Sequence, residues 1–446
     1  MTDTNHNPLV IALDIGTTKV CAIAGRRSEH GRVEVLGIGK VESVGVLRGV
    51  VSNIEKTVRA ITEASSHVRR SSKQDFTHVH VGIAGQHIKS LQHRGLLTRD
   101  SNHTEISKGD IERLIHDMHK LVLPPGDKIL HVIPQEFTVD DERGINDPIG
   151  MSGIRLEANF HIITGQITAS NNIYRCVERT GLKVASMTLE PIASAAAVLS
   201  EEEKEAGVAL VDIGGGTTDI TLFQEGIIRH TAVIPFGGNI ITKDIKEGCR
   251  VMDAQAEKLK IKFGSALANE VFDNRIITIP GLRGRAPKEI SEKNLAHIIQ
   301  ARVEEILDYV LWEMQRSGYE RKLIAGIVLT GGGALLNHIE KLTELHTSMP
   351  TRIGVPVEHL AHGYSKQVSS PIYATAIGLL LKGISDVESG RVRYQQQPKA
   401  EPKTVEPEQQ VVEEKVAAPQ QDNSKWYEQL FNRTKEWFEA EPDSEF

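Results

Sequence analysis

The sequence predicts an α/β protein built from two copies of one β-β-β-α unit, with an inserted subdomain in each copy and a polar tail. Three observations support this prediction. A strand followed by a glycine turn occurs twice, the order of expected strands and helices is interrupted inside each half, and the composition changes after Gly390. The chain of 446 residues is also long enough for two cores, because a single core stops growing at about 250–300 residues.

Composition and charge exclude several classes of protein. Hydrophobic residues make up 39% and charged residues 25% of the chain, as in ordinary globular proteins, and the net charge of −7 disfavours a nucleic-acid partner. Cys21, Cys176 and Cys249 are too few and too far apart for a disulfide framework or a paired-thiol zinc site. No apolar run approaches the roughly 18 residues that a membrane-spanning helix needs, and residues 1–8 have no apolar signal core.

The internal repeat is the strongest organisational signal. Residues 10–19 read VIALDIGTTK and residues 208–219 read VALVDIGGGTTD, so an apolar strand runs into a glycine turn in both. A second strand, a third strand and then helical periodicity follow each turn. We expect the second and third strands at residues 20–24 and 32–39 in the first copy, and at 220–223 and 227–234 in the second.

Each copy is interrupted by a segment of different pattern. The first segment, residues 86–161, contains an expected helix from Lys108 to Leu121, with Ser107 as its N-cap and two prolines after its end. The second segment, residues 242–318, contains expected helices at residues 254–263 and 291–315. We interpret both segments as inserted subdomains.

The tail after Gly390 changes to Gln, Glu, Pro, Lys and Val, a composition that cannot bury enough apolar surface to fold. We therefore predict a disordered linker followed by a terminal helix. The expected boundaries are 7–85, 162–206 and 366–390 for the first domain, 86–161 for its insertion, 207–241 and 319–365 for the second domain, 242–318 for its insertion, 391–423 for the linker and 424–441 for the helix.

The terminal helix is predicted to be amphipathic and to bind a membrane. At 100° per residue, one arc of about 140° holds its bulky apolar side chains. These are Trp426, Tyr427, Leu430, Phe431, Trp437 and Phe438. The flanking cations Lys425, Arg433 and Lys435 suit an anionic leaflet, but several glutamates offset them, so insertion of the aromatics must dominate. A groove on another protein is the alternative binding site for this helix.

Both glycine turns carry the groups that bind a nucleotide phosphate chain. Glycines allow close approach of backbone amides, threonine hydroxyls add donors, and a carboxylate holds hydrated magnesium. From the first turn we expect contacts from Gly16, Thr17, Thr18 and Lys19, and from the second turn contacts from Gly214, Gly215, Gly216, Thr217 and Thr218. Asp14 and Asp212 would face Mg²⁺, mainly through water, so ATP would lie between the two halves.

A third glycine cluster supports the same site. Residues 328–336, VLTGGGALL, end an apolar strand before a helix, and Gly331, Gly332 and Gly333 would allow close approach of a sugar and base. Other nucleotide-binding motifs are missing from the sequence: there is no G-x-x-x-x-G-K-[ST], and no G-x-G-x-x-G follows a strand.

These three motifs resemble those of the actin, Hsp70 and sugar-kinase superfamily, whose domains have a ribonuclease H-like fold. The resemblance implies an actin-like ATPase fold. It also matches two hinge-crossing helices to residues 190–199 and 370–378, where small residues would let the helices cross closely. By the same resemblance Glu190 would orient the attacking water, and Glu257 and Lys260 would hold ribose and adenine. A solvent-exposed salt bridge within one helix is the alternative for that pair.

Within this superfamily the sequence most resembles the bacterial cell-division family FtsA, over residues 10–441. The segments specific to that family are residues 210–219, the stretch VIPFGGNIITKDI at 233–245, the insertion in the first domain and the tethered terminal helix. The resemblance implies that the insertion at 86–161 is SHS2-like and contacts other division proteins. It also implies that Arg302 and Glu305 bind the tubulin-like ring protein FtsZ.

The same resemblance implies a peripheral protein on the cytoplasmic face of the membrane at the division site, polymerising with itself and holding the FtsZ ring. Its role would be chiefly structural, with at most slow ATP hydrolysis. Two members of the superfamily remain as alternatives: the actin-like protein of type IV pilus assembly, and a sugar-kinase-like enzyme. The terminal helix disfavours both.

Overall fold

The structure is a computed structural model that describes residues 8–99, 105–273, 275–280, 286–361, 365–392 and 394. The chain divides into two units, residues 1–394 and 395–446. The predicted terminal helix and almost all of the predicted linker therefore lie outside the described residues. Within the described part of the chain, no helix is both long enough and apolar enough to cross a membrane.

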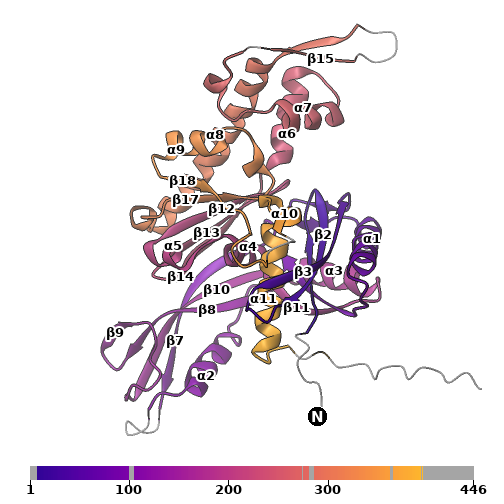
Figure 1. Cartoon of the computed structure of the whole chain (residues 1–446). Helices are drawn as coiled ribbons and strands as arrows, with labels where there is room; N and C mark the ends of the chain where they lie inside the picture. The colour runs from indigo at the N-terminus through magenta and orange to yellow at the C-terminus, as the bar shows by residue number, and fades with distance from the viewer. Residues whose placement is uncertain are drawn as a thin grey trace, which may run out of the picture. The chain divides into compact units, whose positions relative to one another are not determined.

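The first domain contains a five-stranded sheet in the order β11-β6-β1-β2-β3. Figure 1 labels β2, β3 and β11 of this sheet. Its strands are β1 (Val10–Ile15), β2 (Lys19–Arg27), β3 (Val33–Glu42), β6 (His78–Ile83) and β11 (Lys183–Leu189). Both faces of β1 are buried, because Ile11 and Leu13 face α1 (Ile54–Ser72) and α3 (Ile167–Glu178) while Val10 and Ala12 face α4 (Glu190–Val198) and α11 (Ala374–Glu388). The domain is therefore a sheet between two helical layers.

The second domain repeats this sheet in the corresponding order β18-β17-β12-β13-β14. Its strands are β12 (Val208–Ile213), β13 (Thr218–Gln224), β14 (Ile227–Ile234), β17 (Ile327–Thr330) and β18 (Thr351–Ile353). In both domains the first hairpin is antiparallel and the fourth strand runs parallel to the first. This correspondence confirms the internal repeat and the actin-like fold class.

The insertion in the first domain forms its own sheet, in the order β7-β10-β8-β9. Its strands are β7 (Lys89–Thr98), β8 (Asp127–Val139), β9 (Glu142–Ile145) and β10 (Arg155–Gln166). The predicted helix is present as α2 (Lys108–Met118) with Ser107 as its N-cap, but it ends before Leu121. The amides of His119, Lys120 and Leu121 bond to carbonyls three residues back, so the chain leaves the α-helix through a tighter, 3₁₀-type turn.

The second insertion carries the helices that the sequence predicted. They are α7 (Asp253–Phe263) and α8 (Glu292–Ser317), next to α6 (Gly238–Cys249) and the hairpin of β15 (Ile276–Ile279) and β16 (Lys288–Ser291). The remaining elements are short: β4 (Val46–Leu47), β5 (Val50–Val51), α5 (Glu201–Ala206), η1 (Ala268–Glu270), η2 (Glu320–Lys322), η3 (Gly333–Leu335), α9 (Ile339–Thr347), α10 (Ser365–Val368) and η4 (Pro371–Tyr373).

The two predicted hinge helices, α4 and α11, cross in direct contact. A Cβ added to Gly378 would lie 1.7 Å from the carbonyl oxygen of Ala193, so glycine is required at that crossing. The second helix is less regular than predicted, because residues 371–373 form the 3₁₀ turn η4 before α11 begins at Ala374. The first turns of the two segments, at Glu190 and Pro371, therefore line the same cavity.

Candidate nucleotide site

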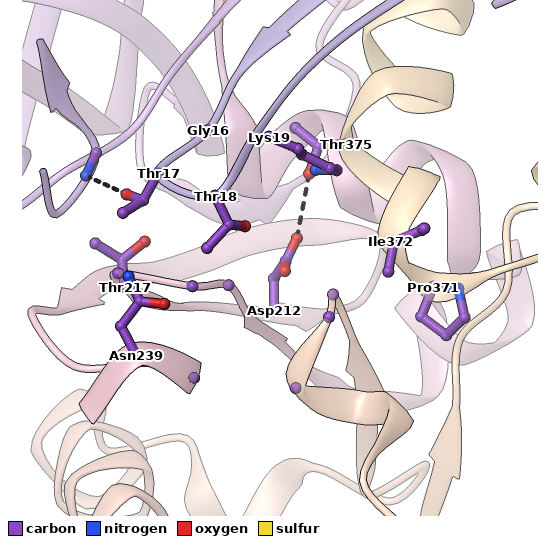
Figure 2. A pocket seen from close by; sticks show the side chains of 18 of the residues that line it. Gly16, Thr17, Thr18, Lys19, Asp212, Thr217, Asn239, Pro371, Ile372 and Thr375 are labelled. Atoms are coloured by element: carbon purple, nitrogen blue, oxygen red, sulfur yellow. Dashed lines mark hydrogen bonds between the residues drawn. The ribbon is translucent and has the colours of Figure 1, made fainter. Parts of the chain in front are cut away.

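One cavity of about 350 Å³ lies between the two domains. This volume is within the range of small-ligand sites in proteins, which is about 300–1,000 Å³. Figure 2 shows Thr17, Thr18 and Lys19 on one side of it and Asp212 and Thr217 on the other. The cavity therefore brings together two turns that are almost 200 residues apart in the chain.

The first turn is closed by one backbone bond and carries its own ion pair. The Gly16 amide donates to the carbonyl of Lys19 at 2.9 Å, and Lys19 Nζ lies 2.8 Å from Asp14 Oδ2. Burial alone would lower the pKa of Lys19, but the charge and hydrogen bond of Asp14, with other nearby anionic groups, raise it. Thr17 Oγ1 accepts from the Gly49 amide at 3.1 Å, which fixes the turn (Figure 2).

The second turn is closed in the same way but holds two carboxylates. The Gly214 amide donates to the carbonyl of Thr217 at 2.9 Å. Asp212 accepts from Ser194 Oγ at 2.8 Å and from Thr375 Oγ1 at 3.3 Å. Burial raises the pKa of Asp212, and burial together with the negative charge of Asp212 raises the pKa of Asp219 well above its usual range. This side of the cavity therefore favours a bound cation.

Glu190 is the first residue of α4 and lines the same cavity. Its side chain lies over Gly82, where a Cβ would come within 2.9 Å of the carboxylate oxygen Oε1. Burial, and next the negative charges of Asp14 and Asp219, raise the pKa of Glu190 well above the usual value. The carboxylates of Asp14, Glu190, Asp212 and Asp219 thus line the same cavity as the ammonium group of Lys19.

The donor set fits a magnesium nucleotide. One carboxylate oxygen of Asp219 is buried without a hydrogen-bond partner among the described residues. No three His, Cys, Asp or Glu side chains in the described part of the chain converge closely enough to ligate a metal ion directly. Carboxylates around a metal that keeps several of its waters are the usual arrangement for Mg²⁺ beside a nucleotide.

The third glycine cluster forms another wall of the cavity. Gly331 has φ +82°, and a Cβ there would lie 2.3 Å from Asp212 Oδ1. Leu335, Leu336, Pro371 and Ile372 add apolar surface beside the cluster. Close backbone and apolar side chains together suit the flat face of a base.

Glu257 and Lys260 both line the cavity, and they also pair with each other at 2.8 Å. Lys260 Nζ donates further bonds to the Gly238 carbonyl at 2.9 Å and to Thr242 Oγ1 at 2.8 Å. The salt bridge that the sequence left as an alternative is therefore present, and it lies at the site. Thr242 also donates to Glu257, so these three side chains form one network at the start of α6.

One expected site residue does not line the cavity. Thr218 is fully buried, and its hydroxyl donates to the Phe236 carbonyl at 2.8 Å. The sequence reasoning also missed several residues that do line it: Lys40, Gly49, Ala84, Asn239, Ile261 and Thr375. Asn239 had a usable signal, because it follows the glycine pair of the 233–245 stretch, whereas Lys40 and Ala84 had none.

Arg302 and Glu305 lie away from this cavity, on α8. They line a second hollow of about 280 Å³ with Asp244, Ile298 and Ala301. Arg302 pairs with both Asp244 and Glu305. The expected membrane-binding residues between Lys425 and Phe438 lie outside the described residues.

Comparison with solved structures defines the class of protein. The fold is similar to that in the "PilM-PilN type IV pilus biogenesis complex", with TM-score 0.59, 13% identity, and coverage of 84% of this chain and 98% of that one. It is also similar to MreB 5 of Spiroplasma citri bound to AMPPNP, with TM-score 0.53, 16% identity, and coverage of 86% and 99%. At these identities the likeness shows the fold alone, which is actin-like.

Sequence comparison defines the family. The model described as cell division protein FtsA matches residues 209–378, and that of the SHS2 domain inserted in FtsA matches residues 85–164. The cell division protein FtsA of Pseudomonas aeruginosa is 42% identical over 87% of this chain and 93% of its own. That of Escherichia coli is 34% identical over 84% and 90%. This chain belongs to the FtsA family of cell division proteins, and the pilus-assembly alternative is not favoured.

Proposed function

We propose that this protein binds Mg·ATP in the cavity between its two domains. The observation that carries the proposal is the facing of the two glycine turns across one cavity, with four carboxylates beside them. Gly16, Thr17, Thr18 and Lys19 would hold the phosphates from one side, and Gly214, Gly215, Gly216 and Thr217 from the other. Asp14 and Asp212 would hold Mg²⁺ mainly through water, and Mg²⁺ would supply the charge that neutralises the phosphates.

The remaining residues suit a protein that hydrolyses ATP slowly. Glu190 would orient the attacking water, but its raised pKa favours the protonated form, which is a weaker proton acceptor than an ordinary carboxylate. Glu257 and Lys260 would contact the ribose and adenine, with Gly331, Gly332 and Gly333 below the base. ATP would then act chiefly by holding the two domains together.

Calorimetric titration of the full chain tests this proposal directly. Mg·ATP is expected to bind, and ATP in excess EDTA is expected to bind at least about tenfold more weakly, which corresponds to about 1.4 kcal/mol. Equal affinities in the two titrations would show that magnesium does not contribute to nucleotide binding. No heat of binding at millimolar Mg·ATP would refute nucleotide binding altogether.

We further propose that the hollow on α8 binds the C-terminal peptide of FtsZ, which fits the family's place in cell division. Arg302, its two carboxylate partners and the apolar Ile298 line the hollow, so a peptide with both charged and apolar side chains would suit it. In cells the protein would then hold the FtsZ ring, and the subdomain at 86–161 would contact later division proteins.

The FtsZ site is tested by reversing both charges, Arg302→Glu with Glu305→Lys. Peptide binding measured by fluorescence anisotropy should weaken about tenfold or more, while affinity for ATP should stay unchanged. Because Arg302 also pairs with Asp244, the melting temperature is measured first. The matched control is Glu340→Lys, an exposed charge on α9. Equal peptide binding by the wild type and the double variant would exclude this hollow.

We also propose that residues 424–441 attach the protein to the inner face of the membrane, where it polymerises. A fully buried large apolar side chain contributes about 1.5–3 kcal/mol, which helix ordering partly offsets at about 1–2 kcal/mol per residue. Attachment of one copy should therefore be weak, and a polymer should bind more tightly through avidity.

Flotation with anionic liposomes tests the attachment. Trp437→Glu puts a charge in the middle of the aromatic arc and should release the protein, whereas Glu436→Lys, on the opposite face, should strengthen attachment. Deleting residues 424–446 gives the reference for complete loss. If the Trp437→Glu protein floats as the wild type does, the helix is not the anchor, and binding to a protein groove replaces this reading.

A further inference from the structure

The sheet of the inserted subdomain, residues 86–161, packs against strand β14 of the second domain. In Figure 1, β7, β8 and β10 pass directly below β14. Gln135 Nε2 donates to the Ile228 carbonyl at 3.0 Å, and His161 Nε2 lies 3.1 Å from Thr231 Oγ1. The subdomain therefore holds both the main chain and a side chain of β14.

An ion pair strengthens the same contact. Arg229, whose side chain is only 4% exposed, places Nη1 at 2.8 Å from Oε1 of Glu136 on β8. Its Nη2 lies 2.7 Å from Glu225, within the second domain. Because a buried guanidinium is costly without partners, Glu136 holds β14 in a defined position against the subdomain.

Strand β14 leads directly into the wall of the nucleotide cavity. Ile234 pairs with Thr218 at the end of the second glycine turn, and the Phe236 carbonyl accepts from the Thr218 hydroxyl. The Gly238 and Asn239 amides then donate to the carbonyls of Gly214 and Gly215, both at 2.8 Å. A displacement of β14 must therefore move the turn that faces the phosphates.

The same subdomain holds the other side of the cavity through His131 of β8. Its Nε2 accepts the Leu189 amide at 2.9 Å, and Leu189 is the N-cap of α4, directly before Glu190. Burial, with a smaller effect from the charge of Lys382, lowers the pKa of His131 to about 4, so the ring is neutral and can accept at physiological pH. The contact fixes the backbone from which Glu190 enters the cavity.

We propose that the inserted subdomain positions the nucleotide site although it does not line the cavity. On one side, His131 holds the backbone directly before Glu190. On the other side, Glu136 binds Arg229 and so holds strand β14, which leads to Gly238 and Asn239. The inference rests on the proposed binding of Mg·ATP. His131, Glu136 and Arg229 are positioning residues that do not touch the nucleotide. By thermodynamic linkage, Mg·ATP binding must in turn stabilise the subdomain's contacts with both domains.

Two single variants of the full chain test the inference. Glu136→Ala removes one partner of Arg229 but leaves Glu225, and the Glu136 side chain is 39% exposed, so the fold should survive. His131→Leu removes the acceptor of the Leu189 amide, and His131→Gln can restore it through its amide oxygen. The matched control is Glu142→Ala, an exposed position of β9 in the same sheet. Melting temperatures are measured for all four variants.

The first measurement is the affinity for Mg·ATP by calorimetry. Glu136→Ala and His131→Leu should each weaken it about threefold to tenfold, as expected for residues that couple two sites. His131→Gln should recover most of the wild-type affinity, and Glu142→Ala should match the wild type. Affinities within twofold of the wild type in both test variants would overturn the inference.

The second measurement is hydrogen exchange of the full chain with and without Mg·ATP. In the wild type the nucleotide should slow exchange in β13 and β14 and also in β8 and β10. In Glu136→Ala the nucleotide should still slow exchange in β13 and β14 but no longer in β8 and β10. Protection of β8 and β10 that is unchanged by both test variants would contradict the coupling. A wild-type protein that fails to bind Mg·ATP would instead refute the proposed function, and this inference with it.

Discussion

The two glycine turns have the same backbone bond but carry different charges. In each, the amide of the first glycine donates to a carbonyl three residues later at 2.9 Å. The hairpin register makes Asp14 equivalent to Asp212, and Cys21, which pairs with Asp14, equivalent to Asp219, which pairs with Asp212. The backbone bond makes Lys19 equivalent to Thr217. The first turn therefore has an aspartate, a lysine and a cysteine where the second has an aspartate, a threonine and a second aspartate.

This difference indicates which of the two turns a bound cation would stabilise more. Asp14 already has the ammonium of Lys19 at 2.8 Å. Asp212 has only the hydroxyls of Ser194 and Thr375, and Asp219 keeps one oxygen without a partner among the described residues. Of the two turns, the first therefore carries its own lysine, whereas the carboxylates of the second would be stabilised by a bound cation. Substitutions in the two turns should have different consequences.

The largest expected effect is Lys19→Met in the first turn. Asp14 is 2% exposed, so removing its partner leaves a buried charge unpaired, and the nucleotide-free protein should lose about 3 kcal/mol of unfolding free energy. Chemical denaturation measures the loss. Lys40→Met is the control, because Lys40 lines the same cavity but is exposed. Equal stability of the two variants would contradict the role of the ion pair.

The next effect is Asp212→Ala in the second turn. It should weaken binding of Mg·ATP on the order of 100-fold, or about 2.7 kcal/mol, because it removes a carboxylate that is proposed to face the metal. The fold should persist, since Ser194 Oγ and Thr375 Oγ1 still lie 3.0 Å apart and can bond to each other. Calorimetry with Mg·ATP measures the affinity. An unchanged affinity would exclude Asp212 from the metal site.

The smallest effect concerns pH. The pKa of Asp219 is raised in the folded protein, so between the ordinary value of about 4 and the raised value the folded state binds the extra proton. Without nucleotide or metal, stability should therefore fall as pH rises through that range.

Asp219→Asn removes this titration, and it should flatten the dependence of melting temperature on pH and stabilise the protein at pH 8 by about 1 kcal/mol. Asp75→Asn, at a side chain that is 96% exposed, should change neither the pH dependence of the melting temperature nor the stability at pH 8. A wild-type melting temperature that rises with pH in the absence of metal would show that the sign is wrong.

The sequence alone determined those features that depend on neighbours in the chain. An apolar strand, a glycine turn and a carboxylate are encoded within about a dozen residues, so the repeat at 10–19 and 208–219 predicted both domains and the two turns that face each other across the cavity. Strand β14 was predicted with its observed limits, Ile227–Ile234, because the residues that favour a strand there are consecutive in the chain. The hinge helices were expected from the resemblance to the superfamily, and Gly378 shows why small residues are needed where they cross.

The tertiary structure alone decided the features that depend on distant pairing. Thr218 and Thr217 are adjacent and chemically identical, yet only the side chain of Thr217 reaches the cavity, because successive side chains along a strand point to opposite faces. The contacts of His131 with Leu189 and of Arg229 with Glu136 join residues 58 and 93 positions apart. No local pattern encodes such pairs, since they arise only when the inserted sheet packs against both domains, and that packing determines how the two halves of the site are held.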